Sequence, residues 1–339
     1  MSTSIVSAAT KVTFRDDGIC QLDRKPFFPI GCWVYSIDSN VIADLHEHHF
    51  NTVTGNGLAP KDVPMLEKHG LMAIPFASDD FVKAAKGSPS LLAWYLTDEP
   101  EEHNETPAQV LAKYTSLKAK DPDHPIGITH DMLSGPPKYK GSCDFTMTDV
   151  YPVTRDRDWP LKAVGDYTDG PRQVHGAGWP NFTFIQTFGG PNSDGGKWAQ
   201  PLPYEVRFMA FDALVHRSDG ILYFSYWPQA PQTWASIATL NRDIERLVPW
   251  LIATGEEKPA KSGDAAIEIR AKQIGEGWMI LAVNTSPKTM ETTLNVEGLN
   301  HATLRTPFED QTTTAQSSQW RARFDAYDVK AWLVGDEPQ

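Results

Sequence analysis

Between residues 26 and 255 the sequence alternates short apolar runs with segments of helical spacing, and this alternation restricts the fold more than any other feature. The apolar runs are nearly continuous, which is typical of strands buried on both faces of a parallel sheet. The expected strands are 26–31, 51–54, 71–76, 91–96, 126–130, 145–151, 182–188 and 220–227. Eight strand-and-helix units predict an α/β fold that closes into a (β/α)₈ TIM barrel.

The segments between these strands carry helix signals. Ser39 is the expected N-cap of the helix over 41–48, and Gly70 is expected to end the next one. The region 161–174 is poorly patterned, and Gly170-Pro171 is expected to interrupt it. A doubly wound open sheet is the alternative, but it usually has a glycine-rich turn after its first strand, and Gly31-Cys32-Trp33 is not one.

Two further parts flank the barrel. Residues 12–22 predict a hairpin around Asp17-Gly18 and belong to an N-terminal segment, 1–25. Met1 to Thr10 lacks the apolar core of a signal peptide, so it is either the remnant of a removed signal or a disordered start. The location therefore stays open between cytoplasmic and exported.

Beyond the barrel the composition shifts. Residues 256–263 are rich in Lys, Pro, Ser and Gly and are expected to form a linker. Short strand-like runs divided by turn residues follow, and they predict a small all-β sandwich over 264–339. Its expected strands are 266–271, 278–284, 292–296, 302–306, 320–324 and 329–334.

Composition excludes several classes of partner. The formal net charge is −12 and there is no long basic run, so we expect neither a nucleic acid nor an anionic membrane as partner. No stretch approaches the ~20 apolar residues of a membrane span. Cys20, Cys32 and Cys143 are sparse, odd in number and without metal-ligand spacing, so we expect them to be buried and unbridged. We predict no cofactor and no metal, and the sequence does not indicate an oligomeric state.

The carboxyl ends of barrel strands form the working face of such a fold. Here carboxylates and aromatic residues follow the expected strands, and no nucleophilic Ser or Cys stands in a recognisable motif. The residues delivered there are Trp33, Tyr35, Asn56, Asp79, Asp80, Asp98, Glu99, Glu101, His130, Asp131, Asp149, Tyr151, Gln186, Phe188, Tyr226 and Trp227. Glycoside cleavage needs two carboxyl groups beside a sugar ring, and this set supplies them.

The string from Leu91 to Pro100, which ends in Thr97-Asp98-Glu99-Pro100, resembles the fourth strand of a known family. It is similar to the barrel β-glycosidases and β-galactosidases of the large retaining clan (clan A), which carry a C-terminal sandwich. There the strand ends in Asn-Glu-Pro and the Glu is the acid/base. Segments 24–31, 50–53, 220–227 and 278–285 fit the same resemblance. It implies a β-linked glycoside as substrate, Glu99 as general acid/base and Trp227 as a sugar platform.

Two residues depart from that family. Asp98 replaces the expected Asn, and Gln186 stands on strand seven where the family has its nucleophilic Glu. Either another carboxylate does that work, or the enzyme inverts through a water molecule, or hydrolysis has been lost, or Gln186 is an engineered change. Asp149 is the favoured second carboxylate, ahead of Glu205 and Asp98. A water-activating Asp149 should lie roughly 6.5–9.5 Å from Glu99, whereas ~5–5.5 Å implies retention.

We therefore expect a glycoside hydrolase whose catalytic carboxyls are Glu99, Asp149 and Asp98. The expected substrate-binding residues are Trp33, Tyr35, His130, Tyr151, Gln186, Tyr226 and Trp227. Helix capping is the alternative role for the Asp98-Glu99 pair, and a cap or an ion pair is the expected role of Glu205. Two other functions stay open: a non-catalytic carbohydrate-binding protein, and a metal-dependent barrel enzyme that uses Asp149, His130 and Asp79.

Overall fold

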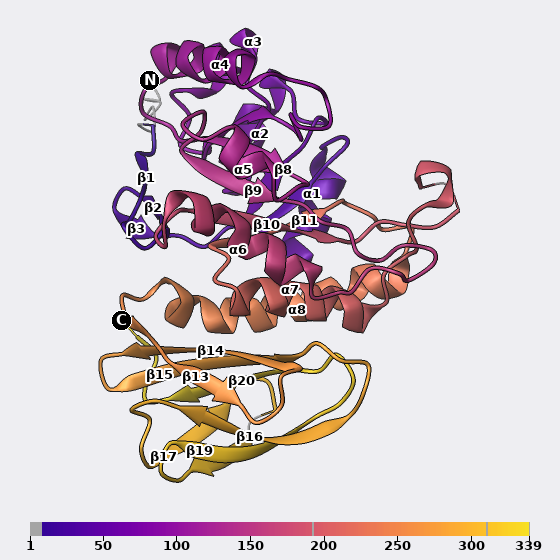
Figure 1. Cartoon of the computed structure of the whole chain (residues 1–339). Coiled ribbons are helices and arrows are strands. Elements are labelled where there is room, and N and C mark those ends of the chain that lie inside the picture. The colour runs from indigo at the N-terminus through magenta and orange to yellow at the C-terminus, as the bar shows by residue number, and fades with distance from the viewer. Residues whose placement is uncertain (1–8, 192, 310, 339) are drawn as a thin grey trace. The chain divides into compact units, whose positions relative to one another are not determined.

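The computed structural model describes residues 9–191, 193–309 and 311–338 (Figure 1). Most of the segment Met1 to Thr10, expected to be a signal remnant or a disordered start, lies outside them. Two compact units make up the chain and are described separately. The first contains residues up to 150, together with 167–187 and 219–227, and the second contains 151–166, 188–218 and the chain from 228 onward. The expected boundaries 1–25, 26–255 and 264–339 stay predictions.

The first unit holds an eight-stranded parallel sheet with the order β6-β5-β4-β11-β10-β9-β8-β7. Its strands are β4 (Ile30–Trp33), β5 (Thr52–Thr54), β6 (Met72–Ile74), β7 (Trp94–Thr97), β8 (Ile126–His130), β9 (Phe145–Thr148), β10 (Asn181–Gln186) and β11 (Gly220–Phe224). Parallel bridges from Ala73 to Leu91 and from Phe76 to Tyr95 join the two ends of this sheet. The sheet therefore closes, which confirms the TIM barrel and rules out the open sheet.

Burial explains why these runs form strands. All residues of β8 and β10 are buried, including polar ones such as Thr129 and Asn181, as expected for a sheet covered on both faces. Close packing also requires Gly31, because a Cβ there would stand 2.4 Å from Cδ2 of Leu222 on the neighbouring strand. The predicted free cysteines, Cys20, Cys32 and Cys143, are buried and unbridged.

The N-terminal hairpin covers one end of the barrel. It consists of β1 (Val12–Phe14) and β2 (Cys20–Leu22), which pair antiparallel, and β3 (Lys25–Pro26) extends it. The ring of Phe14 lies 5.4 Å from that of Phe145 and 6.2 Å from that of Phe182, at the amino ends of β9 and β10. The hairpin thus packs at the end of the barrel opposite the carboxyl ends of the strands.

Most expected helices are present. They are α1 (Ser39–Glu47), α2 (Val63–His69) after the 3₁₀ turn η1 (Pro60–Asp62), α3 (Asp79–Ala85), α4 (Pro107–Lys120), α5 (Gly135–Lys138), α6 (Ala163–His175), α7 (Pro203–Val215) and α8 (Pro231–Ile252), with η2 (Asp194–Gly196). We expected Ser39 to be the N-cap of α1, but the N-cap is Asp38. Its carboxylate accepts hydrogen bonds from the backbone N–H groups of Asn40 and Val41. The Asp side chain reaches both amides from outside the first turn, as a cap requires.

The interruption expected at Gly170-Pro171 does not occur, because α6 continues through it. A proline removes one backbone donor from a helix, and contacts on either side offset that loss. Thr168 Oγ1 lies 3.0 Å from Thr183 Oγ1, and Arg172 forms a buried ion pair with Asp219. Tertiary contacts therefore hold the second half of α6 where local sequence predicts a break.

The second unit contains two antiparallel sheets with the orders β12-β14-β15-β20-β17-β18 and β13-β16-β19, which form the predicted sandwich. The strands are β12 (Glu256–Lys258), β13 (Ala260–Ser262), β14 (Ile267–Ile274), β15 (Gly277–Asn284), β16 (Met290–Val296), β17 (Ala302–Thr306), β18 (Gln311–Ala315), β19 (Gln319–Phe324) and β20 (Val329–Val334). Trp320 and Trp332, with ring centroids 5.3 Å apart, lie in its core.

Three of these strands were not expected. Residues 256–263, expected to be a linker, contain β12 and β13, and β18 lies in a polar run. All three are edge strands, and each pairs with its sheet on one side only. An edge strand is held mainly by backbone hydrogen bonds and need not be apolar, so hydrophobic patterning does not reveal it.

Among the described residues, no helix is both long and apolar enough to cross a membrane.

Candidate active site

Three carboxyl groups meet at the carboxyl ends of the barrel strands. Asp98 and Glu99 follow β7, and Asp149 follows β9. Each offers an oxygen atom within 4.8 Å of the other two. The three residues predicted to be catalytic are thus brought together, because parallel strands end at one rim of the barrel.

The backbone holds Glu99 in an unusual conformation. Its φ angle is +38°, in the left-handed region that is costly for a residue with a side chain. Three hydrogen bonds fix this turn: the amide of Glu99 donates to the carbonyl of Thr129, and the amides of Glu102 and His103 donate to the carbonyl of Glu99. Such strain clusters at functional sites, where surrounding contacts maintain it.

A hydrogen bond joins the carboxyl groups of Glu99 and Asp149. Burial raises the pKa of Asp149 well above its ordinary value, and repulsion from Glu99 and Asp98 raises it further. Burial also raises the pKa of Glu99, which the hydrogen bond from Asp149 opposes and the charge of Asp98 reinforces. This is the pattern of a protonated Asp149 donating to the Glu99 carboxylate. The pair therefore retains a proton at a pH where isolated carboxyl groups have lost theirs.

Asp98 is positioned from inside the barrel. Its carboxylate accepts a 2.5 Å hydrogen bond from the hydroxyl of Tyr95, which itself accepts from the hydroxyl of Thr129. The ring of Tyr95 packs against Phe76 and Trp33, with centroids 4.3 and 5.9 Å away. Burial raises the pKa of Asp98, and the Tyr95 hydrogen bond opposes the rise. This packed chain fixes the Asp98 carboxylate beside Glu99.

Asp131, which follows β8, is a further acidic residue of the rim. Burial raises its pKa to about 7, and repulsion from Glu99 and Glu101 contributes. Its Oδ1 atom is buried and has no hydrogen-bond partner in the part of the chain that the structure describes. The sequence placed Asp131 at the working face of the barrel, but we predicted no catalytic or binding role for it.

His130, the last residue of β8, is a wall residue. It is buried, and its Nδ1 lies 3.1 and 3.2 Å from the two carboxylate oxygens of Glu101. Its ring stacks on Tyr139 with centroids 5.9 Å apart.

Asp79, in the first turn of α3, is exposed and pairs with Lys120. Neither His130 nor Asp79 is among the groups of possible metal ligands in the described residues, so the expected metal set of Asp149, His130 and Asp79 is not assembled.

The aromatic residues of the first unit differ in exposure. Trp33 is buried, and four rings surround it at 5.2 to 6.2 Å: Phe76, Tyr95, Phe184 and Phe224. Tyr35 is 52% exposed and its ring lies 6.4 Å from that of Phe224. Their predicted role in binding substrate stays a prediction.

Gln186, Tyr226 and Trp227 complete the predicted binding set in this unit. Gln186 is the last residue of β10 and is fully buried. The hydroxyl of Tyr226 donates to Asp44 at 2.8 Å, and Trp227 is half-buried. Their contact with a sugar stays a prediction.

Tyr151 and Glu205 belong to the second unit. Tyr151 packs edge-to-face against Phe188 and Trp198, at 5.1 and 6.0 Å. Glu205 is buried in the first turn of α7, where it accepts from the amide of Leu202 and pairs with Arg157. Glu205 is therefore both a cap and an ion-pair partner, as expected.

Solved structures of glycoside hydrolases share this fold. A family 30 endoxylanase from Clostridium papyrosolvens is similar over 98% of this chain and 98% of its own, with a TM-score of 0.58 at 10% identity. A family 27 β-L-arabinopyranosidase from Geobacillus stearothermophilus is similar over 91% of this chain and 97% of its own, with a TM-score of 0.63 at 9% identity. A family 5 glycoside hydrolase from Bacteroides vulgatus is similar over 96% of this chain and 93% of its own, with a TM-score of 0.61 at 11% identity.

At these identities the likeness concerns the fold, and at that level it confirms the predicted resemblance to barrel glycoside hydrolases. No family model matches the sequence. No curated protein matches it either.

Proposed function

We propose that this protein hydrolyses the O-glycosidic bond of a β-linked glycoside, with Glu99 as the general acid. The observation that carries the proposal is the hydrogen-bonded pair of Glu99 and Asp149 at the carboxyl end of a closed barrel. General acid catalysis needs a carboxyl group that keeps its proton near neutral pH, and burial of this pair provides one. The likeness to several glycoside hydrolases supports the same reaction class.

In the proposed reaction, the one proton that the pair holds passes from Asp149 to Glu99 through their hydrogen bond. Glu99 then gives this proton to the glycosidic oxygen as the bond to the anomeric carbon breaks, and the pair is left without a proton. Asp149 is thus the residue that stores the proton which Glu99 delivers. Asp98, oriented by Tyr95, accepts a hydrogen bond from a sugar hydroxyl.

A second carboxylate must activate the water molecule that attacks the anomeric carbon. Oxygen atoms of Asp98, Glu99 and Asp149 lie within 4.8 Å of one another, closer than the roughly 6.5–9.5 Å that leaves room for a water between acid and base. We therefore do not assign Asp149 as the base. We assign that role to Asp131, because its pKa of about 7 suits a base near neutrality and its Oδ1 has no hydrogen-bond partner among the residues described.

A panel of aryl β-glycosides tests this function. The wild type should release the phenol, and Glu99→Gln should not do so at a comparable rate. The matched control is Glu276→Gln, which makes the same change at an exposed turn between β14 and β15. Equal turnover by wild type and Glu99→Gln would remove Glu99 from the mechanism.

One observation favours a second function, a non-catalytic carbohydrate-binding protein. Gln186 stands fully buried at the end of β10, where the resembling family has its nucleophile. An amide is a poor nucleophile, but it binds sugar hydroxyls well. Saturable sugar binding without turnover by the wild type would support this function. Strong activity in Gln186→Glu would show that the chain is a disabled retaining enzyme and would exclude Asp131 as the base.

A further inference from the structure

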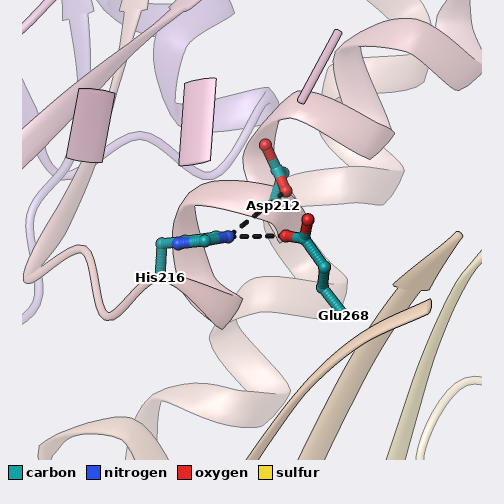
Figure 2. Close-up of side chains that lie close together, drawn as sticks. All are labelled: Asp212, His216 and Glu268. Atoms are coloured by element: carbon teal, nitrogen blue, oxygen red, sulfur yellow. Dashed lines mark hydrogen bonds and ion pairs between the residues drawn. The ribbon is translucent and has the colours of Figure 1, made fainter. Parts of the chain in front are cut away.

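Three potential metal ligands converge in the second unit. Asp212 and His216 are one helical turn apart at the carboxyl end of α7, and Glu268 lies on β14 of the sandwich (Figure 2). Each offers one ligand atom within 4.8 Å of the others. No spacing motif in the sequence predicts this group, because Glu268 is distant along the chain.

The ring of His216 points its Nε2 atom at both carboxylates (Figure 2). Nε2 lies 2.7 Å from Oε2 of Glu268 and 3.9 Å from Oδ1 of Asp212. Ligand atoms around a tetrahedral Zn²⁺, each about 2.0–2.2 Å from the metal, stand roughly 3.3–3.6 Å apart. The two observed separations fall on either side of this range, so shifts of about half an ångström would bring both into it.

Asp212 leaves an oxygen unused. Its side chain is fully buried, and its Oδ2 accepts a 2.7 Å hydrogen bond from the amide of Gly165. Its Oδ1 has no hydrogen-bond partner within residues 9–191, 193–309 and 311–338 and faces the cluster. Buried carboxylate oxygens are normally satisfied, so an orphaned one needs an explanation. A bound cation would satisfy it.

Gly165 keeps the space open. A Cβ at this position would stand 2.4 Å from Cδ2 and 2.7 Å from Nε2 of His216, and 2.9 Å from Oδ2 of Asp212. Glycine inside a helix costs roughly 0.5–1 kcal/mol relative to alanine. At this position of α6, glycine leaves the cluster unobstructed.

The charges are unbalanced without an ion. Two carboxylates face one imidazole, and the half-exposed Lys162 stands further from the cluster, with its Nζ 3.9 Å from Oε1 of Glu268. Asp166 adds further negative potential near Asp212. The carboxyl end of α7 also contributes partial negative charge. With a neutral His216, one divalent cation neutralises both carboxylates.

An opening lets an ion and its water reach the cluster. An open cavity of about 380 Å³ is lined by His216 and Glu268, together with Lys261, Ser262 and Asp264. We propose that Asp212, His216 and Glu268 form a binding site for a divalent transition-metal cation, Zn²⁺ being the best match. One nitrogen and two carboxylate oxygens suit Zn²⁺ better than Mg²⁺, which prefers oxygen ligands alone. The ion would link β14 to α7.

Titration of the EDTA-treated full chain with ZnCl₂, by calorimetry and by metal analysis after gel filtration, tests the site. The wild type should bind one Zn²⁺ and unfold at a higher temperature with it, and MgCl₂ should not replace Zn²⁺. Glu268→Gln and His216→Gln should lower the affinity by at least ~100-fold, since even groups that only orient ligands are worth 10–100-fold. Gly165→Ala removes no ligand and favours the helix, yet it should also weaken binding.

Asp149→Asn is the matched control, because Asp98, Glu99 and Asp149 are the other group of possible ligands among the described residues. It should leave Zn²⁺ binding unchanged. Loss of binding in Asp149→Asn with retention in Glu268→Gln would move the ion to the barrel rim and overturn the proposal. No binding by the wild type, or undiminished binding by both ligand variants, would also overturn it and would leave His216 as an imidazolium bridging two carboxylates.

Discussion

The carboxyl group of Asp149 is hydrogen-bonded to that of Glu99, although the two residues follow different barrel strands. The strands β7 and β9 are not neighbours in the sheet, because β8 lies between them. The contact therefore depends on the curvature of the closed barrel, which brings the ends of both strands to one rim. Our first three predictions concern this rim.

Replacing Glu99 by Gln should lower kcat on an unactivated glycoside by about 10²–10⁴-fold, since the amide cannot protonate the leaving oxygen. Aryl glycosides with very acidic phenols should be affected least, because their leaving groups need little protonation. Steady-state kinetics across a series of phenols checks this dependence. A uniform loss across the series would indicate a role in binding instead.

Replacing Asp149 by Asn should move the alkaline limb of the kcat/KM profile to lower pH. The wild-type pair keeps its proton until Asp149 ionises, and the pKa of Asp149 is raised well above its ordinary value. In the variant the proton must reside on Glu99, whose pKa the hydrogen bond from residue 149 lowers. The variant should also be more stable than the wild type at pH 8. The raised pKa of a buried carboxyl makes ionisation costly for the folded state, so stability is lost as pH rises above the unfolded pKa. Thermal unfolding at pH 5 and pH 8 measures the difference, and an unshifted alkaline limb would contradict the proposed pairing.

Because of Asp131, the free energy of unfolding should fall as the pH rises from about 4 to about 7. Its pKa rises from 3.8 to about 7 in the folded protein, so the folded state binds more protons than the unfolded state in this window. Stability contributed by the protonated form is therefore lost as pH rises. Asp131→Asn should flatten this part of the unfolding profile, and it should lower kcat if Asp131 activates water. NMR of the first-formed anomer should then show inversion in the wild type.

The ion pair of Arg172 and Asp219 should be important for stability. Their side chains are 8% and 6% exposed, and the Asp219 carboxylate also accepts from the amide of Asn181. Arg172→Ala leaves a buried charge unpaired and should cost about 3–5 kcal/mol of unfolding free energy. The matched control is Arg321→Ala, whose pair with Glu291 is exposed at 75% and 55%. Urea unfolding should show a change of at most about 1 kcal/mol for the control. Equal losses for the two variants would contradict the prediction.

The barrel and the sandwich were predictable from the residue pattern alone. A strand buried on both faces such as β4, with Ile30, Gly31, Cys32 and Trp33, consists of apolar residues, so burial leaves a direct record in the sequence. The position of Glu99 after the fourth strand followed from the same pattern, because every strand of a parallel barrel ends at one rim. The free cysteines were predictable from their small number and their spacing.

Features that depend on partners distant in the chain became visible only in the folded protein. The edge strands β12, β13 and β18 are held by backbone pairing, which places little demand on side chains. The continuity of α6 through Pro171 rests on contacts with other elements. The meeting of Glu99 with Asp149, and of His216 with Glu268, depends on the direction of side chains from separate elements. Periodicity records which face of an element is buried, but it does not record which residue of another element lies opposite.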